Sequence, residues 1–393
     1  MIIEPKIRGF ICMTAHPKGC RKNVENQAEL IRRAFPERPQ SGPKKVLVLG
    51  CSTGYGLASR MTAAFAYKAA TIGVMFEKEE SSRRTATAGF YQTRAFEELA
   101  TEQGLYARTV NGDAFSAEVK QQVIDLIRSD LGQVDLVVYS LAAPRRKIND
   151  ELTYSSTLKT VGEPFCNLTW EMRDDSLREV EIPAATEEEI EHTVKVMGGE
   201  DWEDWIAALE QAGVLAEGAM TVAYSYIGPK LTYPIYRDGT IGAAKKHLHA
   251  TAERLNQTYG ERLRAVVSVN KAVVTQASSA IPVVPLYLAL LYKVMKNKGL
   301  HEGCTEQIIR LFAERLYGVQ GLQIEQDGLI HLDDWEMRDD VQAEVSRVWQ
   351  TMTPENWKTF ADLEGYQKEF KQLFGFEIEQ VDYQEDIPLG EQA

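Results

Sequence analysis

The stretch KKVLVLGCSTGYGLASR, from Lys44 to Arg60, decides the fold. Its first half is a short apolar run typical of a buried strand, and the alanine-rich pattern that begins at Leu57 is typical of a helix. Between them lie three glycines, at positions 50, 54 and 56. Glycines at such a junction permit a tight turn and let backbone N–H groups approach a pyrophosphate at the positive end of the helix. The stretch therefore predicts a dinucleotide-binding unit of the Rossmann type.

The next hundred residues or so alternate in the same way. Further strands are expected at 71–76, 106–115 and 134–144, and helical patterns occupy 95–104 and 117–132 between them. Strands that alternate with helices form parallel sheets covered on both faces. The chain is therefore predicted to be an α/β protein with a doubly wound parallel sheet.

The alternation stops after the fourth strand. The segment Cys166–Ile182 reads as a hairpin that turns at RDDS, and two helical patterns follow it. The sheet is expected to resume with strands at 219–228 and 263–275. Farther on, GLIHL (328–332) reads as a strand, and TPEN reads as a helix cap at Thr353 followed by proline in the first helical position.

These patterns divide the chain into three parts. Residues 1–43 are expected to form an N-terminal segment packed on the main domain. Residues 44–319 are expected to form the NADH-binding Rossmann and catalytic domain, with a substrate-binding insertion at 145–217. Residues 320–393 are expected to form a C-terminal α+β appendage.

Composition excludes some functions. The chain has 57 acidic and 44 basic residues, a net charge of −13, which opposes general binding to nucleic acid or to anionic membranes. The longest apolar run, Ala280 to Tyr292, is broken by two prolines and is shorter than the roughly 20 residues of a membrane span. Five scattered cysteines and the lack of a signal-peptide pattern predict a cytoplasmic protein with free thiols.

An acidic residue follows the second strand. Glu77 lies twenty-one residues after Gly56, where a carboxylate would bind the adenosine ribose and repel a 2′-phosphate. This favours NADH over NADPH. Lys78, Arg83 and Arg84 nearby weaken that inference without reversing it.

Two other chemistries deserve comparison. Gly50 to Gly54, with Ser52 at its centre, also matches the G-x-S-x-G nucleophile elbow of serine hydrolases, but the only late histidines are His301 and His331. The residues Cys12, His16 and Cys20 are four apart, as metal ligands on one helix face would be. Pro17 and Gly19 interrupt that helix, so a structural turn is favoured and no metal is expected.

A tyrosine- and lysine-rich stretch, Tyr224 to Lys246, suggests proton transfer. Tyr236 and Lys245 are nine residues apart, which would place them on opposite faces of one continuous helix. They can cooperate if Tyr236 precedes the helix, and Gly239 makes such a break plausible. Tyr226 would then emerge at the carboxyl end of a strand, where α/β folds bind ligands. Packing roles for these tyrosines are an equally good reading of the spacing.

Several motifs resemble those of one family. They are HPKGC, GCSTGYGLASR, TIGVMFEKE, GDAFS, VYSLAAPRR, KVMGGEDW, AYSYIGP, YRDGTIGAAK, VSVNKAVVTQAS, IPVVPLY and DDWEMRDDVQ. The chain resembles, nearly end to end, the trans-2-enoyl-CoA reductases and FabV-type enoyl-acyl-carrier-protein reductases, enlarged relatives of the short-chain dehydrogenase/reductases. The Tyr-x8-Lys pattern of Tyr236 and Lys245 is specific to this family among those relatives.

The resemblance implies a set of site residues. Those for the cofactor are Gly50, Cys51, Ser52, Thr53, Gly54 and Tyr55 at the phosphates, Phe76, Glu77, Asp113 and Ala114 at the adenosine, and Leu141, Ala142, Val274, Thr275 and Gln276 at the nicotinamide. It further implies that Tyr226 binds the substrate carbonyl, that Tyr236 donates the proton and that Lys245 binds the nicotinamide ribose. A nearby Lys245 ammonium is expected to lower the pKa of Tyr236.

The implied activity is NADH-dependent reduction of the trans-2 double bond of enoyl thioesters in fatty acid synthesis, without metal or flavin, by a monomer. The thioester would be carried by coenzyme A or by acyl carrier protein. Two basic clusters could meet the carrier: Arg145, Arg146 and Lys147, or Lys293, Lys296 and Lys298. A carbonyl reductase, a serine hydrolase and a dinucleotide sensor are the alternatives.

Overall fold

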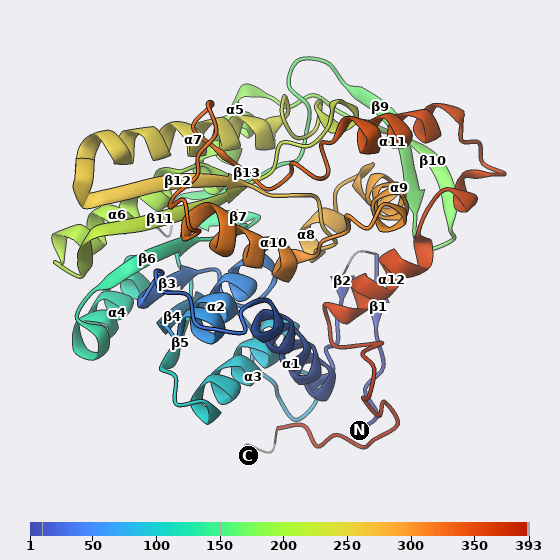
Figure 1. Ribbon diagram of the computed structural model, residues 1–393. Helices are drawn as coiled ribbons and strands as arrows, with labels where there is room; N and C mark the ends of the chain where they lie inside the picture. The colour runs from blue at the N-terminus through green and yellow to red at the C-terminus, as the bar shows by residue number, and fades with distance from the viewer. Residues whose placement is uncertain (10, 150, 391–393) are drawn as a thin grey trace.

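A seven-stranded parallel sheet forms the centre of the computed structural model, which describes residues 1–9, 11–149 and 151–390 (Figure 1). Its strand order is β13-β12-β11-β6-β3-β4-β5, and every pair is parallel. The strands are β3 (Lys45–Leu49), β4 (Ala70–Met75), β5 (Ala107–Asn111), β6 (Val134–Tyr139), β11 (Leu215–Ser225), β12 (Leu263–Val269) and β13 (Ile330–His331). The order reverses between β3 and β6, which is where doubly wound sheets bind ligands.

Helices cover both faces of the sheet. One face carries α1 (Pro17–Ala34), α2 (Gly54–Tyr67), α3 (Ala88–Glu102) and α10 (Cys304–Arg310); the other carries α4 (Ala117–Leu126), α6 (Glu200–Gln211) and α7 (Thr240–Tyr259). Strand β3 shows why both faces are covered. Val46 and Val48 belong to a first hydrophobic cluster on one face of the sheet, while Leu47 and Leu49 belong to a second on the other face. A strand buried on both sides reads as a continuous apolar run. The predicted doubly wound α/β fold is confirmed.

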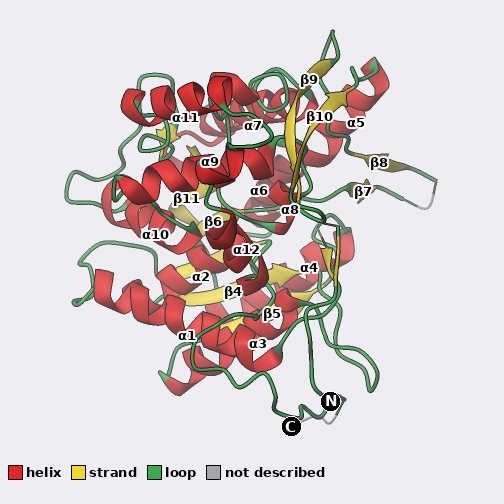
Figure 2. Ribbon diagram, turned by 90° about the vertical axis from the view of Figure 1, so that its right-hand side faces the viewer, coloured by secondary structure: helices red, strands yellow, loops and turns green. Residues whose placement is uncertain are grey.

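Between β6 and β11 the chain leaves the sheet. A short arm, β7 (Arg145–Lys147) with β8 (Thr153–Ser155), projects from the body in Figure 2, and the hairpin β9 (Phe165–Glu171) with β10 (Ser176–Ile182) follows. The hairpin predicted to turn at RDDS is confirmed. Next comes α5 (Glu187–Met197), which packs on α7, and then α6, which covers the sheet as a crossover helix.

A third hydrophobic cluster lies beside the carboxyl ends of the strands. Helices α9 (Val284–Asn297), α11 (Asp339–Thr351) and α12 (Leu363–Gln372) form it together with the hairpin, and the short helix α8 (Gln276–Ser279) leads into α9. Of the fourteen residues of α9, eleven are buried. The cluster draws on segments more than a hundred residues apart, so the C-terminal part of the chain shares its core with the middle.

Short elements complete the chain. They are the N-terminal pair β1 (Ile7–Arg8) and β2 (Ile11–Cys12), the 3-10 turns η2 (Lys230–Thr232), η3 (Gly260–Arg262) and η5 (Trp357–Thr359), and the π-helical turns η1 (Ile127–Leu131) and η4 (Leu311–Leu316). The two ends of the chain meet, since the Met1 amino group donates to the carbonyl oxygen of Ile387 at 2.6 Å.

The strands expected at 106–115 and 134–144 end early, at Asn111 and Tyr139, and two further predictions about elements are wrong. No helix starts at Thr353: its N–H donates to Asn356 Oδ1 at 2.7 Å in a turn, and α12 begins later, capped by the Asp362 side chain. The strand expected to reach Thr275 ends at Val269. The Asn270 N–H still donates to the Ser225 carbonyl oxygen at the end of β11, but beyond it three backbone N–H groups donate to side chains. The donor and acceptor pairs are Lys271 with Gln307, Ala272 with Glu336, and Val274 with Tyr292.

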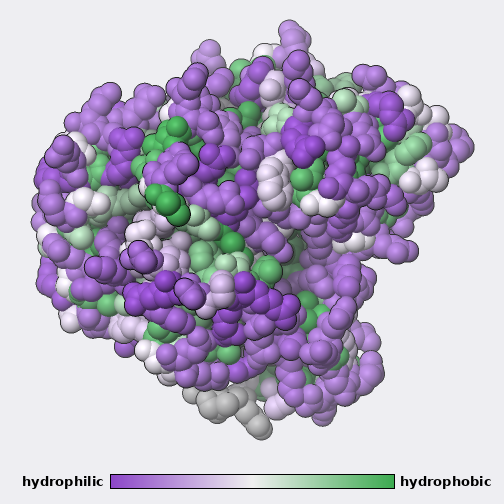
Figure 3. Space-filling view, viewed as in Figure 1, coloured by the Kyte–Doolittle hydropathy of each residue, from purple (hydrophilic) through white to green (hydrophobic). Residues whose placement is uncertain are grey.

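The surface is polar. The face in Figure 3 is mainly hydrophilic, with small hydrophobic groups scattered over it. Within the described ranges, no helix has the length and apolar character needed to cross a membrane.

Candidate active site

The glycine loop between β3 and α2 adopts a backbone that only glycine fits. Gly50 has φ +81°, and a Cβ on it would lie 2.2 Å from the Ser140 carbonyl oxygen; a Cβ on Gly56 would lie 1.9 Å from the Gly50 oxygen. Gly54 also has a positive φ, +55°, but faces open space. Close backbone contact at two glycines and free space at the third leave room for a ligand against the loop.

The amino end of α2 suits a phosphate. Thr53 is its N-cap but makes no side-chain cap, and no acidic residue lies in the first turn. The first N–H groups of a helix lack partners within the helix and carry its positive pole. The loop therefore fits the pyrophosphate of a dinucleotide.

Glu77 lies next to the loop. Its Oε1 accepts a hydrogen bond from Ser52 Oγ at 2.6 Å, and its backbone is tied to Asn111 by bonds of 2.9 and 3.0 Å. A carboxylate there can accept hydrogen bonds from an adenosine ribose. The same bond contradicts the hydrolase alternative, because Ser52 pairs with an acid, whereas His301 and His331 pair with Glu369, Asp327 and Asp333.

A cavity of about 710 Å³ extends from the loop. Six of the predicted cofactor residues line it: Thr53, Gly54, Glu77, Val274, Thr275 and Gln276. The wall after β12 thus faces the glycine loop across one space, as a bound dinucleotide requires. Other parts of the wall come from α1, the N-terminal strand β2, α10 and α12.

The remaining predicted cofactor residues do not line that cavity. Phe76 is 78% exposed, whereas Ala114 is buried and its carbonyl oxygen accepts from Trp205 Nε1 at 3.0 Å. Four of the others lie shortly after strands: Cys51 after β3, Asp113 after β5, and Leu141 and Ala142 after β6. Cys51 is buried, and Asp113 Oδ1 accepts from the Phe115 N–H. Tyr55 lies in the first turn of α2, with its hydroxyl 2.8 Å from the Lys271 carbonyl oxygen.

The two predicted catalytic tyrosines lie together. The rings of Tyr226 and Tyr236 are 4.7 Å apart, centroid to centroid, and meet edge to face at 89°. Tyr226 follows the last residue of β11, and Tyr236 lies in the turn before α7, as expected, because that helix begins at Thr240 with Gly239 as its N-cap. Two phenols at the carboxyl end of the sheet can act on one small group.

The electrostatics differ from the expectation. Burial raises the pKa of Tyr236, and Glu336 and Tyr366 raise it further. Lys245, half-buried in the second turn of α7, donates from Nζ to the Tyr224 carbonyl oxygen at 3.0 Å. Burial lowers the pKa of Lys245 to about 8. The prediction that Lys245 lowers the Tyr236 pKa is therefore wrong for this structure. A desolvated tyrosine that stays protonated remains a proton donor.

Sequence reasoning missed one contact. The Tyr226 hydroxyl donates to Glu336 Oε1 at 3.0 Å. The DDWEMRDDVQ motif contains this glutamate, but nothing in its spacing predicts that it reaches a residue 110 positions earlier.

The basic clusters are largely occupied. Arg146 is buried and pairs with Glu200 and Asp204, both at 3.1 Å. Lys296 pairs with Asp362 at 2.8 Å, and Lys298 with Asp340 at 3.1 Å. Arg146 is therefore a structural residue, which removes it from the predicted carrier contacts.

The Cys12, His16 and Cys20 turn has a structural role. His16 caps α1 by accepting the Gly19 N–H at Nδ1 over 3.1 Å, and Pro17 takes the first helical position. Burial raises the pKa of both Cys12 and Cys20, which keeps the thiols protonated. In the part of the chain that the structure describes, no group of three or more His, Cys, Asp or Glu residues is arranged to hold a metal ion.

The fold and the site together define a Rossmann-type oxidoreductase. Three family models match in succession: the NAD(P)H binding domain of trans-2-enoyl-CoA reductase at residues 2–82, the trans-2-enoyl-CoA reductase catalytic region at 84–317, and an enoyl reductase FAD binding domain at 324–387. The chain belongs to the trans-2-enoyl-CoA reductase family.

Full-length relatives agree with this. An enoyl-acyl-carrier-protein reductase (NADH) of Flavobacterium johnsoniae is 55% identical over 98% of this chain and 97% of its own. A trans-2-enoyl-CoA reductase (NADH) of Ruminiclostridium cellulolyticum is 51% identical over 99% of this chain and 98% of its own. The crystal structure of Treponema denticola trans-2-enoyl-CoA reductase in complex with NAD has a TM-score of 0.95 and 50% identity, covering 99% of this chain and 98% of that one.

The flavin in the third domain's name does not fit the residues present. Between 324 and 387 the glycines do not form a phosphate loop: a Cβ on Gly365 would meet the Asp362 carboxylate at 2.3 Å, and one on Gly375 would meet the backbone of Cys20 at 2.5 Å. The apolar faces of α11 and α12 pack in the third hydrophobic cluster. This segment offers packing surface, and no step of the reaction is assigned to a flavin.

Proposed function

We propose that this chain uses NADH to reduce the trans-2 double bond of enoyl thioesters to the saturated acyl thioester. The observation that carries the proposal is the Tyr226–Tyr236 pair at the carboxyl end of the sheet, the same end at which the loop after β3 fits a dinucleotide. The names of full-length relatives, which specify NADH and either acyl carrier protein or coenzyme A, support it.

Bound NADH supplies the hydride that reaches the β-carbon of the substrate. Charge then develops on the thioester oxygen as an enolate, and the hydroxyl of Tyr226 donates a hydrogen bond to that oxygen. Donors placed where charge develops stabilise the transition state more than the ground state. Tyr236, kept protonated by burial, provides the proton that ends on the α-carbon.

The other predicted residues hold the cofactor. The loop from Gly50 to Tyr55 binds its phosphates, Phe76, Glu77, Asp113 and Ala114 bind the adenosine half, and Leu141, Ala142, Val274, Thr275 and Gln276 enclose the nicotinamide half. Lys245 holds the nicotinamide ribose. The Glu77 carboxylate disfavours a 2′-phosphate, so NADH is preferred to NADPH.

The location, oligomeric state and partners of the enzyme follow from the same reasoning. The enzyme works as a cytoplasmic monomer on thioesters of coenzyme A or acyl carrier protein, without nucleic acid or membrane as a partner. Its net charge of −13 supports the absence of nucleic acid and anionic membrane among its partners.

The first test is NADH oxidation with crotonyl-CoA by the wild type and Tyr236→Phe, with NADPH in parallel. We expect turnover with NADH, weaker turnover with NADPH, and a loss of about 10²- to 10⁴-fold in kcat in the variant, as for removal of a general acid. NADH affinity, followed by its fluorescence, should be unchanged.

Two outcomes would contradict the proposal. Full activity of Tyr236→Phe would remove this tyrosine from the chemistry. Wild-type reduction of a ketone, with none of crotonyl-CoA or a carrier-protein-bound enoyl chain, would favour the carbonyl reductase.

A further inference from the structure

Glu336 is a buried acid without a matching base. Its side chain has no exposed surface, and no ion pair to it occurs within the described residues. Lys271, whose charge acts on this carboxyl, is itself buried and donates from Nζ to the Ala272 carbonyl oxygen at 2.8 Å. Burial raises the pKa of the Glu336 carboxyl. A buried carboxyl is costly unless hydrogen bonds satisfy it.

Three donors satisfy this carboxyl. Oε1 accepts from the hydroxyls of Tyr226 at 3.0 Å and Tyr287 at 2.6 Å, and Oε2 accepts from the Ala272 N–H at 2.7 Å. Gln342 braces the group, since its Nε2 donates to the Glu336 carbonyl oxygen at 2.7 Å and to the Tyr287 hydroxyl at 3.2 Å.

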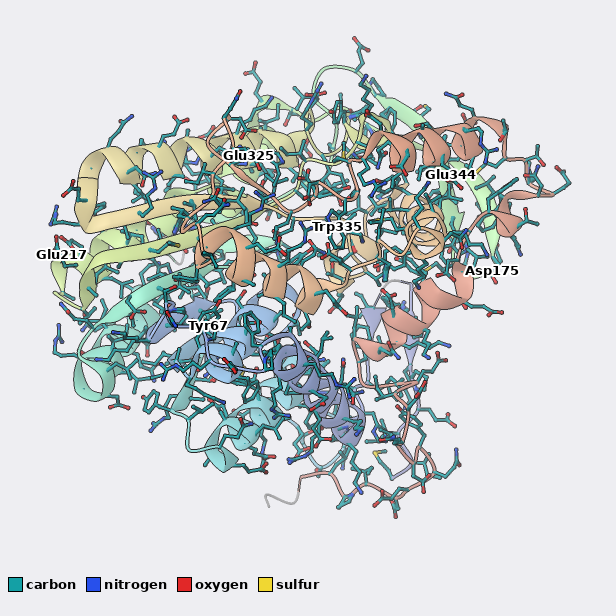
Figure 4. All side chains as sticks on the ribbon, viewed as in Figure 1. Tyr67, Asp175, Glu217, Glu325, Trp335 and Glu344 are labelled. Atoms are coloured by element: carbon teal, nitrogen blue, oxygen red, sulfur yellow. The ribbon has the colours of Figure 1, made fainter. Side chains whose placement is uncertain are left out.

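These bonds join four distant segments. Tyr226 follows β11, Ala272 precedes the loop of Val274 at the cofactor cavity, Tyr287 lies in α9, and Glu336 precedes α11. Trp335, the residue before Glu336, is labelled near the centre of the molecule in Figure 4. One carboxyl thus connects the substrate tyrosine to the cofactor wall.

Tyr226 is confined from the other side as well. A Cβ on Gly228 would lie 2.9 Å from the Tyr226 hydroxyl oxygen, so the backbone there passes close to the phenol. Glu336 on one side and Gly228 on the other leave the phenol little freedom to swing.

We propose that Glu336 is a positioning residue for the reduction: it places the Tyr226 oxygen in the free enzyme, and the single phenol proton turns from Glu336 Oε1 to the thioester oxygen when the substrate binds. This rests on the proposed function. A donor displaced by about 1 Å loses much of its effect on the transition state, so a phenol anchored at its oxygen is worth more than one held by ring packing alone. The C-terminal segment thereby contributes to the reaction without touching substrate.

The test compares two variants of equal side-chain length. Glu336→Gln keeps hydrogen-bonding groups for the phenols, whereas Glu336→Met keeps the volume and removes them. With crotonyl-CoA and NADH we expect Glu336→Met to lower kcat/KM for the thioester by about 10- to 100-fold, the effect of losing one or two such bonds. Glu336→Gln should recover most of that loss. Glu344→Gln, at a half-exposed residue of α11 that pairs with Lys298 and is labelled in Figure 4, is the surface control.

A double-mutant cycle with Tyr226→Phe separates positioning from general structure. If Glu336 acts through Tyr226, Glu336→Met should change kcat/KM by less than about twofold in the Tyr226→Phe background, because coupled residues are not additive. NADH affinity should be equal in all four proteins. Additive losses, or a loss of NADH affinity that accounts for the loss of rate, would overturn the inference.

The failure of the proposed function has a different signature. A wild type that binds NADH but reduces no enoyl thioester would overturn that function and the positioning role with it. Wild-type turnover with additive effects would overturn the positioning role alone. Urea unfolding of the same four proteins shows whether each of them is folded. It also measures the Tyr226–Glu336 coupling in the free energy of unfolding, without substrate.

Discussion

Lys245 shows how burial sets the chemistry of a single residue. In water a lysine stays charged well beyond neutral pH, but here burial lowers the pKa to about 8. Its Nζ donates to the Tyr224 carbonyl oxygen at 3.0 Å. Below about pH 8 it is an ammonium, and above that pH it becomes a neutral amine.

This pKa predicts that kcat/KM for NADH depends on pH. For the proposed ribose contact, kcat/KM for NADH should fall as pH rises through about 8, because the lysine loses its proton there. The Lys245→Arg variant keeps its positive charge over the whole pH range. It should therefore lack this decline in kcat/KM, although its overall rate is lower. Initial rates from pH 6 to 10 measure this, and an identical decline in the arginine variant would assign it to another group.

At the scale of elements, an arginine decides how the inserted arm is attached. Arg146 lies in β7, and its side chain is only 5% exposed, whereas those of Glu200 and Asp204 are 37% and 54% exposed. It also donates to the Lys195 carbonyl oxygen at 3.0 Å. The arm is thus fastened to the region of α5 and α6 by a residue whose sequence neighbours suggested a solvent-exposed basic cluster.

Arg146→Gln should therefore cost stability and spare substrate binding. We expect the free energy of unfolding in urea to fall by about 1–3 kcal/mol. This is less than the loss expected on breaking a fully buried ion pair, because both acids stay partly solvated. KM for crotonyl-CoA should be unchanged. Arg145→Gln, at the exposed neighbour, is the control for stability and should leave the free energy of unfolding unchanged. A raised KM in Arg146→Gln alone would restore the phosphate-binding role.

At the scale of the whole molecule, the C-terminal segment completes both the sheet and a core. Strand β13 pairs with β12, and α11 and α12 pack against α9, which is apolar over most of its surface. The Tyr366 hydroxyl and Ser279 Oγ, 2.8 Å apart, also link α12 to α8 beside the cofactor wall. The segment is therefore integrated with the part of the molecule that holds the tyrosines.

A chain that ends at residue 323 should not fold on its own. Removal of the segment exposes the apolar side of α9 and deletes Glu336, so we expect an insoluble or inactive product. Coexpression of 1–323 with 324–393 should restore a soluble complex with NADH-dependent activity, as measured by copurification and the crotonyl-CoA assay. A soluble, active 1–323 would show that the segment is dispensable.

The sequence by itself determined the Rossmann sheet, its glycine loop and the hairpin, because strand and helix periods and turn residues are local. The Tyr-x8-Lys pattern also located Tyr236 and Lys245 correctly around the start of α7. Only the tertiary structure decided that β12 stops at Val269, that Arg146 is buried, that the Tyr236 pKa rises and that Glu336 reaches Tyr226. Each of these depends on desolvation or on contacts between segments far apart in the chain, which no local pattern encodes.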